Sequence, residues 1–156
     1  ADQEIEKLSL LFGDNAHINA ERIARSVADN ARYNVFGLVD ACLAGNAQRA
    51  VKTVRRMRDE GSEALMITAM LAKEIRQLTD MGNRLQRGEA QSAVFQRHQV
   101  WKNKQALTEK ALRRLKPVRT LQLLDQVREV DLAVKGMHTA PPWVVLEQLV
   151  TRFASA

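Results

Sequence analysis

The chain has 156 residues, 46% of them apolar, so it can bury one hydrophobic core and is too apolar for wholesale disorder. Seven glycines, three prolines, many helix formers and no sustained strand alternation predict an all-α fold. The net charge of +6 favours an acidic partner, with nucleic acid first. A single cysteine rules out an internal disulfide, and no apolar run approaches the length of a membrane span. We therefore expect a cytoplasmic protein without a membrane partner.

The leading residues, 1–32, differ in composition from the rest. Six acidic and four basic residues give them a net charge of −2, which leaves +8 for the remainder. The pattern predicts a helix over 1–12, a turn at 13–15, and a second helix that Asn19 caps. This second helix should turn Ile23, Ala24 and Val27 inward. Two helices bury too little surface to be stable alone, and the chain lacks an initiator Met, so we expect a truncated unit.

Residues 32–78 form the stretch around which the chain is organised. Their apolar spacing predicts three helices separated by turns at Gly45 and Gly61, where a left-handed C-terminal residue is favoured. The third helix is apolar on almost every side from Ala64 to Ala72. A helix without a wide polar face is usually surrounded by others. It should therefore be the central helix of the fold.

The next segment predicts a loop and two helices. Met81–Gly88 is polar and lies between two glycines, so we expect a loop. A short helix should follow over Glu89–His98, with Ala93, Val94 and Phe95 inward. Another is expected over Val100–Leu115.

Prolines mark the starts of the last two helices. Pro117 suits the first turn of a helix, where its missing N–H costs nothing. That helix carries a predicted packing seam of Leu123, Val127, Val130, Val134 and Met137. Pro141 and Pro142 restart a terminal helix, whose inward residues are expected to be Leu146, Leu149, Val150 and Phe153.

The sequence offers no support for catalysis, a cofactor or a metal site. It lacks a glycine-rich phosphate loop, and its three histidines, at 17, 98 and 138, stand apart without ligand spacing. Cys42 lies on the apolar face of a predicted helix, and we expect it to be a small core residue. Glu109 and Asp131 each have a basic residue four positions on, which is typical of surface pairs.

Positive charge is what remains to explain. The second helix of the central stretch exposes five cations, and residues 97–119 hold eight Lys or Arg against one acid, Glu109. Trp101 falls at the edge of a helical apolar stripe, beside Lys102 and Lys104. It can stack an unpaired base while the cations hold phosphate. The alternative is that Trp101 wedges against the next helix and the charges are a solvated face.

Several long stretches resemble the family of delta subunits of the bacterial DNA polymerase III clamp loader. The central one is ARYNVFGLVDACLAGNAQRAVKTVRRMRDEGSEALMITAMLAKEIRQL, residues 31–78. VWKNKQALTEKALRRL, TLQLLDQVREVDLAVKG and the W-x-x-L-E that begins at Trp143 are similar to the C-terminal helices of that family. The resemblance covers essentially the whole chain.

The resemblance implies an architecture. Residues 1–32 correspond to part of a small helical AAA+ lid domain, and 33–156 to the helical collar through which five clamp-loader subunits form a ring. The expected partners are the gamma/tau and delta-prime subunits, with primer–template DNA possible. The sliding clamp is expected to bind only an upstream part. The chain itself would be non-catalytic and without cofactor, inside the DNA-directed DNA polymerase III holoenzyme, a nucleotidyltransferase.

The resemblance also bears on DNA contact. The basic stretch around Trp101 matches the part of the family near the template strand. The candidate DNA-binding residues are Arg97, His98, Trp101, Lys102, Lys104 and His138. The alternative function is an independent basic helical module that binds single-stranded nucleic acid.

Overall fold

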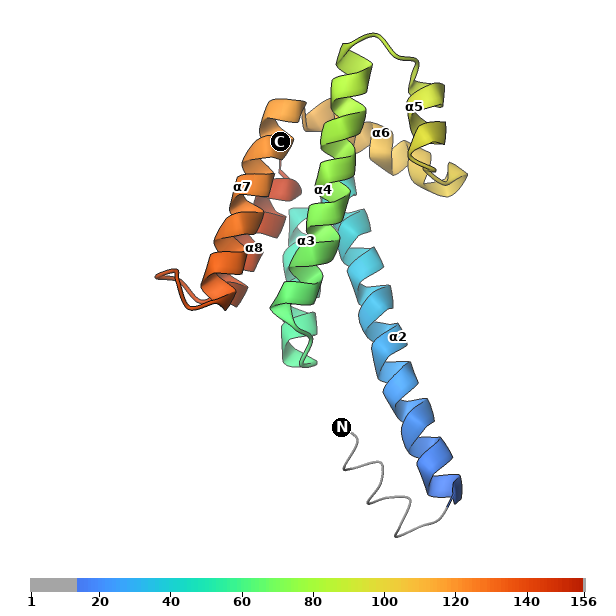
Figure 1. Cartoon of the computed structure of the whole chain (residues 1–156), viewed down its shortest axis with the longest axis vertical. Coiled ribbons are helices and arrows are strands. Elements are labelled where there is room, and N and C mark those ends of the chain that lie inside the picture. Colours follow the sequence, from blue (N-terminus) through green and yellow to red (C-terminus); the bar gives the residue numbers. More distant parts are fainter. Residues whose placement is uncertain (1–13, 156) are drawn as a thin grey trace. The chain divides into compact units, whose positions relative to one another are not determined.

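The computed structural model describes residues 14–155, with side chains from His17 onward, and these residues form helices and turns without a strand. The helices are α2 (Asp14–Ala44), α3 (Ala47–Asp59), α4 (Ala64–Gln86), α5 (Gln91–Arg97), the 3-10 helix η1 (Lys102–Lys104), α6 (Gln105–Arg114), α7 (Pro117–Val134) and α8 (Pro142–Phe153) (Figure 1). The all-α prediction is confirmed. The helix predicted over 1–12 lies outside the described residues.

Helix α2 is longer than the sequence predicted. It begins at Asp14 and runs unbroken to Ala44, so the turn expected at residues 14 and 15 and the cap expected at Asn19 are wrong. No proline interrupts this segment, and its many alanines favour helix. Ile23 and Val27, expected inward, are exposed. The boundary between the two compact units of the chain lies inside α2, between Asn34 and Val35.

The second unit is built around α4, as predicted. This helix contacts α5, α6, α7 and α8, and Figure 1 shows α7 and α8 on one side of it, with α5 and α6 on the other. Its buried positions recur every three or four residues and include Ile67, Leu71, Ile75 and Leu78. Leu65 in the first turn is 48% exposed, so burial on all sides is wrong there.

The two predicted glycine turns are confirmed. Gly45 and Gly61 have φ of 77° and 83°, a left-handed conformation that L side chains resist. After Gly45, the Asn46 N–H donates to the Ala41 carbonyl at 2.9 Å, which closes the end of α2. The turn lets α3 start within two residues.

The loop predicted at Met81–Gly88 is wrong, because α4 continues to Gln86. Met81 and Gly82 are buried. A Cβ on Gly82 would stand 3.1 Å from Cγ of Pro117, so the absent side chain lets α7 approach α4 closely. Burial against α7 thus overrides the local preference for a turn.

The last two helices begin near their prolines, as predicted. The seam of α7 holds at Leu123 and Val130, which are buried, but fails at its end, because Val134 is 38% and Met137 70% exposed. Helix α8 turns the four predicted residues into the core, namely Leu146, Leu149, Val150 and Phe153. Trp143 is half-buried and packs against the core.

Arg114, the last residue of α6, joins the ends of two other helices. Its Nη1 donates to the carbonyls of Phe153 (2.7 Å) and Ser155 (2.8 Å) at the end of α8. Its Nη2 donates to the carbonyl of Cys42 at 2.8 Å, at the end of α2. A cation there meets carbonyls at helix ends, and the carbonyl of Cys42 also accepts from the Gly45 N–H at 3.2 Å.

Cys42 is a core residue, as predicted. It is fully buried, and this burial raises the pKa of its thiol to about 12, with Arg114 acting in the opposite direction. A thiol with so high a pKa is a poor nucleophile at neutral pH.

Candidate nucleic-acid interface

The candidate interface is the turn between α5 and α6. Val94 and Phe95 are the buried residues of α5 and fix this short helix to the core. The helix ends with two bonds: the Gln99 N–H donates to the Gln96 carbonyl (3.1 Å) and the Val100 N–H to the Phe95 carbonyl (2.9 Å). This is the same pattern that closes α2 at Gly45.

Gln99 occupies the left-handed position of this turn, with φ of 52°. Four glycines hold the other left-handed positions in the described part of the chain, and Gln99 is the one residue there with a side chain. Such a residue costs about 1 to 2 kcal/mol relative to ordinary backbone. Strain of this kind is found at functional sites more often than elsewhere.

Trp101 follows the strained turn and is 73% exposed. Its backbone is extended (φ −63°, ψ 147°), and its carbonyl accepts from the Lys104 N–H at 2.8 Å. The helix predicted from Val100 begins only at Gln105, so the placement of Trp101 at the edge of a helical stripe is wrong. Leaving an indole this exposed forgoes about 3 kcal/mol of hydrophobic stabilisation.

The basic candidates near Trp101 differ in their surroundings. Arg97 and Lys102 are exposed. Lys104 is half-buried, and its Nζ donates to Oδ2 of Asp40 on α2 at 2.7 Å. Burial raises the pKa of the nearby Glu74, and the charge of Asp40 adds to the shift, against the pull of Lys104. Two exposed cations therefore lie within four residues of Trp101 along the chain, and a third is held by an acid.

His98 is held between two acceptors. Its Nδ1 lies 3.0 Å from the Val94 carbonyl oxygen, and its Nε2 lies 2.7 Å from Oδ2 of Asp80 on α4. Its side chain is 12% exposed. Both ring nitrogens are thus engaged within the fold.

His138 lies in a different place. It belongs to the turn between α7 and α8, on the far side of α4 from α5 and η1 in Figure 1. Its Nδ1 accepts from the Ala140 N–H at 2.9 Å, and its Nε2 lies 2.9 Å from Oε2 of Glu129. The structure brings the candidates from Arg97 to Lys104 together and leaves His138 apart from them.

Helix α3 carries a second cationic surface. The five cations predicted on its outer side are exposed, namely Arg49, Lys52, Arg55, Arg56 and Arg58. Arg55 pairs with Glu147 of α8 at 2.9 Å. The surface pairs predicted for Asp131 with Lys135 (2.8 Å) and Glu109 with Arg113 are confirmed.

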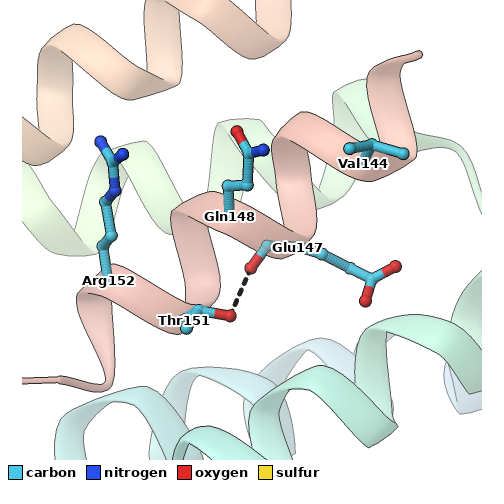
Figure 2. A pocket seen from close by; sticks show the side chains of 5 residues that line it. All are labelled: Val144, Glu147, Gln148, Thr151 and Arg152. Carbon is cyan, nitrogen blue, oxygen red and sulfur yellow. Dashed lines mark hydrogen bonds between the residues drawn. The ribbon is translucent and has the colours of Figure 1, made fainter. Parts of the chain in front are cut away.

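A hollow of about 330 Å³ follows the solvent face of α8. Figure 2 shows its lining side chains along one face of the helix: Val144, Glu147, Gln148, Thr151 and Arg152. The Thr151 hydroxyl donates to the Glu147 carbonyl at 2.7 Å, and Arg152 reaches Gln126 of α7 at 3.3 Å. These are helix-surface contacts, without a nucleophile set beside a base.

Two further results concern the described residues alone. Among residues 14–155, no group of three His, Cys, Asp or Glu side chains is arranged to hold a metal ion. Within the same range, each helix falls short of the length or apolar character that crossing a bilayer requires.

Comparison with known proteins identifies the family. Residues 35–154 match the family described as the processivity clamp loader gamma complex DNA pol III C-term. The chain belongs to this family. The matched residues almost coincide with the second compact unit, 35–156.

Two relatives share most of this chain. The DNA polymerase III subunit delta of Escherichia coli (strain K12) is 31% identical over 150 residues, which are 94% of this chain and 42% of the relative. The subunit of the same name from Haemophilus influenzae (strain ATCC 51907) is 22% identical over 155 residues, 94% of this chain and 45% of the relative. The chain thus spans less than half the length of either relative. The resemblance predicted from the sequence is confirmed.

Sequence reasoning missed the residues that support the candidate interface. Asp80 accepts from Arg84 Nε at 2.9 Å as well as contacting His98, and Arg84 also meets Glu89 at 3.2 Å. The spacing of Asp80 and Arg84 suits neighbouring turns of a helix, but it carries meaning only once α4 is known to reach that far. The pairing of Asp40 with Lys104 had no local signal.

Proposed function

We propose that this chain is an assembly module of the DNA polymerase III clamp loader, which places the sliding clamp on primed DNA. Membership of the clamp-loader family over 35–154 carries the proposal. The module has a structural rather than a catalytic role in a nucleotidyltransferase assembly, and it works in the cytoplasm. Residues 33–156 act as the collar, and 1–32 as part of the lid.

The proposed partners are the gamma/tau and delta-prime subunits, bound through the collar. A collar needs a rigid body, and α4 surrounded by four other helices supplies one. Exposed apolar side chains of this unit, including Val118 (72%) and Met137 (70%), leave surface available for neighbouring subunits. The sliding clamp is reached only through a part outside this chain.

Co-elution tests this assembly. The chain is mixed at micromolar concentration with gamma/tau and delta-prime and separated by size exclusion with light scattering. We expect one complex that contains all three. Elution of the chain as a separate monomer would argue against the proposal.

We further propose that Trp101 stacks on an unpaired template base, with Arg97 and Lys102 contacting phosphate. The exposed indole, with an exposed cation on either side of it in the sequence, supports this. Lys104 and His98 are held by acids and contribute charge or position, and His138 has no part in this contact.

The exposed Trp101 also suits a second function, an independent module that binds single-stranded nucleic acid. That module would bind DNA tightly without any partner, and its affinity would fall steeply with salt. The collar proposal predicts weak binding by the chain alone and tighter binding within the assembled complex, since avidity then adds to the single contact.

Replacing Trp101 with alanine should weaken binding of a single-stranded oligonucleotide about tenfold, because one base–aromatic stack is worth about 1 to 3 kcal/mol. Fluorescence anisotropy of a labelled oligothymidylate, with the chain alone and with the partner subunits, measures the change. Phe36→Ala is the matched control, because Phe36 is 55% exposed on α2 and should leave affinity unchanged. Equal loss in both variants, or none in either, would rule out stacking by Trp101.

A further inference from the structure

The surroundings of His98 offer two hydrogen-bond acceptors to its ring. The Val94 carbonyl is an acceptor, and an ionised Asp80 is an acceptor. Both ring nitrogens face such atoms, at 3.0 Å and 2.7 Å, so each must carry a proton for both bonds to form.

Several charged groups lie around the ring. Asp80 and Arg84 come from α4, Glu89 from the turn before α5, and Arg97 precedes His98 in the chain. The pKa of Asp80 lies below its ordinary value, first because Arg84 donates a hydrogen bond to it, with a further bond from His98. Asp80 therefore stays ionised where the histidine ring is protonated.

His98 lies at the start of the turn between α5 and α6. It ends α5, and its backbone N–H donates to the same Val94 carbonyl at 3.1 Å. Gln99, the strained residue, comes next, and Trp101 follows two positions later. Helix α5 buries only two side chains, and the bond from His98 to Asp80 adds a direct link from the turn to α4.

We propose that His98 is a positioning residue: its imidazolium, bonded to Asp80 and to the Val94 carbonyl, holds the strained turn and directs Trp101 towards an unpaired base. Loss of the ring proton leaves one N–H for two acceptors, so one bond is lost and the turn loosens. The affinity for single-stranded DNA therefore falls once the ring gives up this proton. This inference rests on the proposed contact between Trp101 and DNA.

The first measurement needs no DNA. In the nitrogen-15-labelled chain, the indole N–H signal of Trp101 is assigned by its loss in Trp101→Phe, and that of Trp143 serves as reference. We expect the Trp101 signal to shift between about pH 5.5 and about pH 8 and to stay still in His98→Gln. His138→Gln is the matched control, because His138 also meets a carboxylate and lies in another turn. It should shift as the wild type does.

The second measurement is oligothymidylate affinity at the two ends of this range. We expect the wild type to bind about fivefold more weakly at the higher pH, and His98→Gln to lose most of that dependence. Asp80→Asn, which removes the charge and keeps the shape, should flatten the response as well and serves if His98→Gln fails to fold.

The outcomes separate the two proposals. A Trp101 signal that is insensitive to pH in the wild type, or equally sensitive in His98→Gln, overturns the positioning role and leaves the DNA contact standing. If the Trp101 signal behaves as expected but Trp101→Ala leaves the affinity for DNA unchanged, the proposed stacking of Trp101 on a base is overturned.

Discussion

Replacing Arg114 with methionine is expected to lower the free energy of unfolding by about 3 kcal/mol. The guanidinium donates to three carbonyls at the ends of α2 and α8, where the N–H groups of a following helical turn are missing. Hydrogen bonds from a charged donor are worth about 1.5 to 3 kcal/mol each, and the cost of desolvating the partly buried guanidinium offsets part of their sum. Methionine keeps much of the volume and removes every donor. Chemical denaturation followed by circular dichroism measures the difference.

Arg113→Met is the control for this change. Arg113 is the neighbouring residue on α6, its side chain is 76% exposed, and its described ion pair is with Glu109 one turn away. A surface pair of this kind contributes less than about 1 kcal/mol. If the two variants lose the same stability, Arg114 does not join the helix ends in the manner described.

Replacing Ile75 with alanine should cost about 3 kcal/mol. Ile75 is fully buried in α4, the helix that α5, α6, α7 and α8 contact. Removing three buried carbon atoms loses their transfer free energy and leaves a cavity, for a total of about 2 to 5 kcal/mol. Thermal and urea unfolding would both report the loss.

Leu65→Ala tests whether position within α4 decides the effect. Leu65 lies on the same helix but is 48% exposed, so its truncation should cost under about 1 kcal/mol. A cost at Leu65 equal to that at Ile75 would mean that α4 is covered over its first turn as well. The central position assigned to the helix would then need revision.

Periodicity and turn chemistry predicted the helices of the second unit well. Gly45 and Gly61 marked true helix ends, because a left-handed residue follows each helix. Gly82 misled the same reasoning. The absent side chain of Gly82 lets Pro117 approach closely. Because the two residues are far apart in the sequence, no local pattern predicts this contact.

The candidate interface was predicted in composition but not in form. The residues around Trp101 were expected to be helical. Instead, Gln99 adopts a left-handed conformation after α5, at a position where the sequence has no glycine to indicate a helix end. The partners that define the site come from far away: Asp80 for His98 and Asp40 for Lys104. Such pairings depend on how α2, α4 and α5 pack, and helix faces alone do not specify them.

Competition with a full-length delta subunit tests the central claim most directly. A clamp loader is assembled from gamma/tau, delta-prime and labelled delta, and rising amounts of this chain are present from the start. Native mass spectrometry counts the subunits in each complex. We predict that the chain replaces the labelled subunit one for one, so that complexes contain either one or the other. Undiminished incorporation of the labelled subunit at a large excess of the chain would contradict its role as an assembly module.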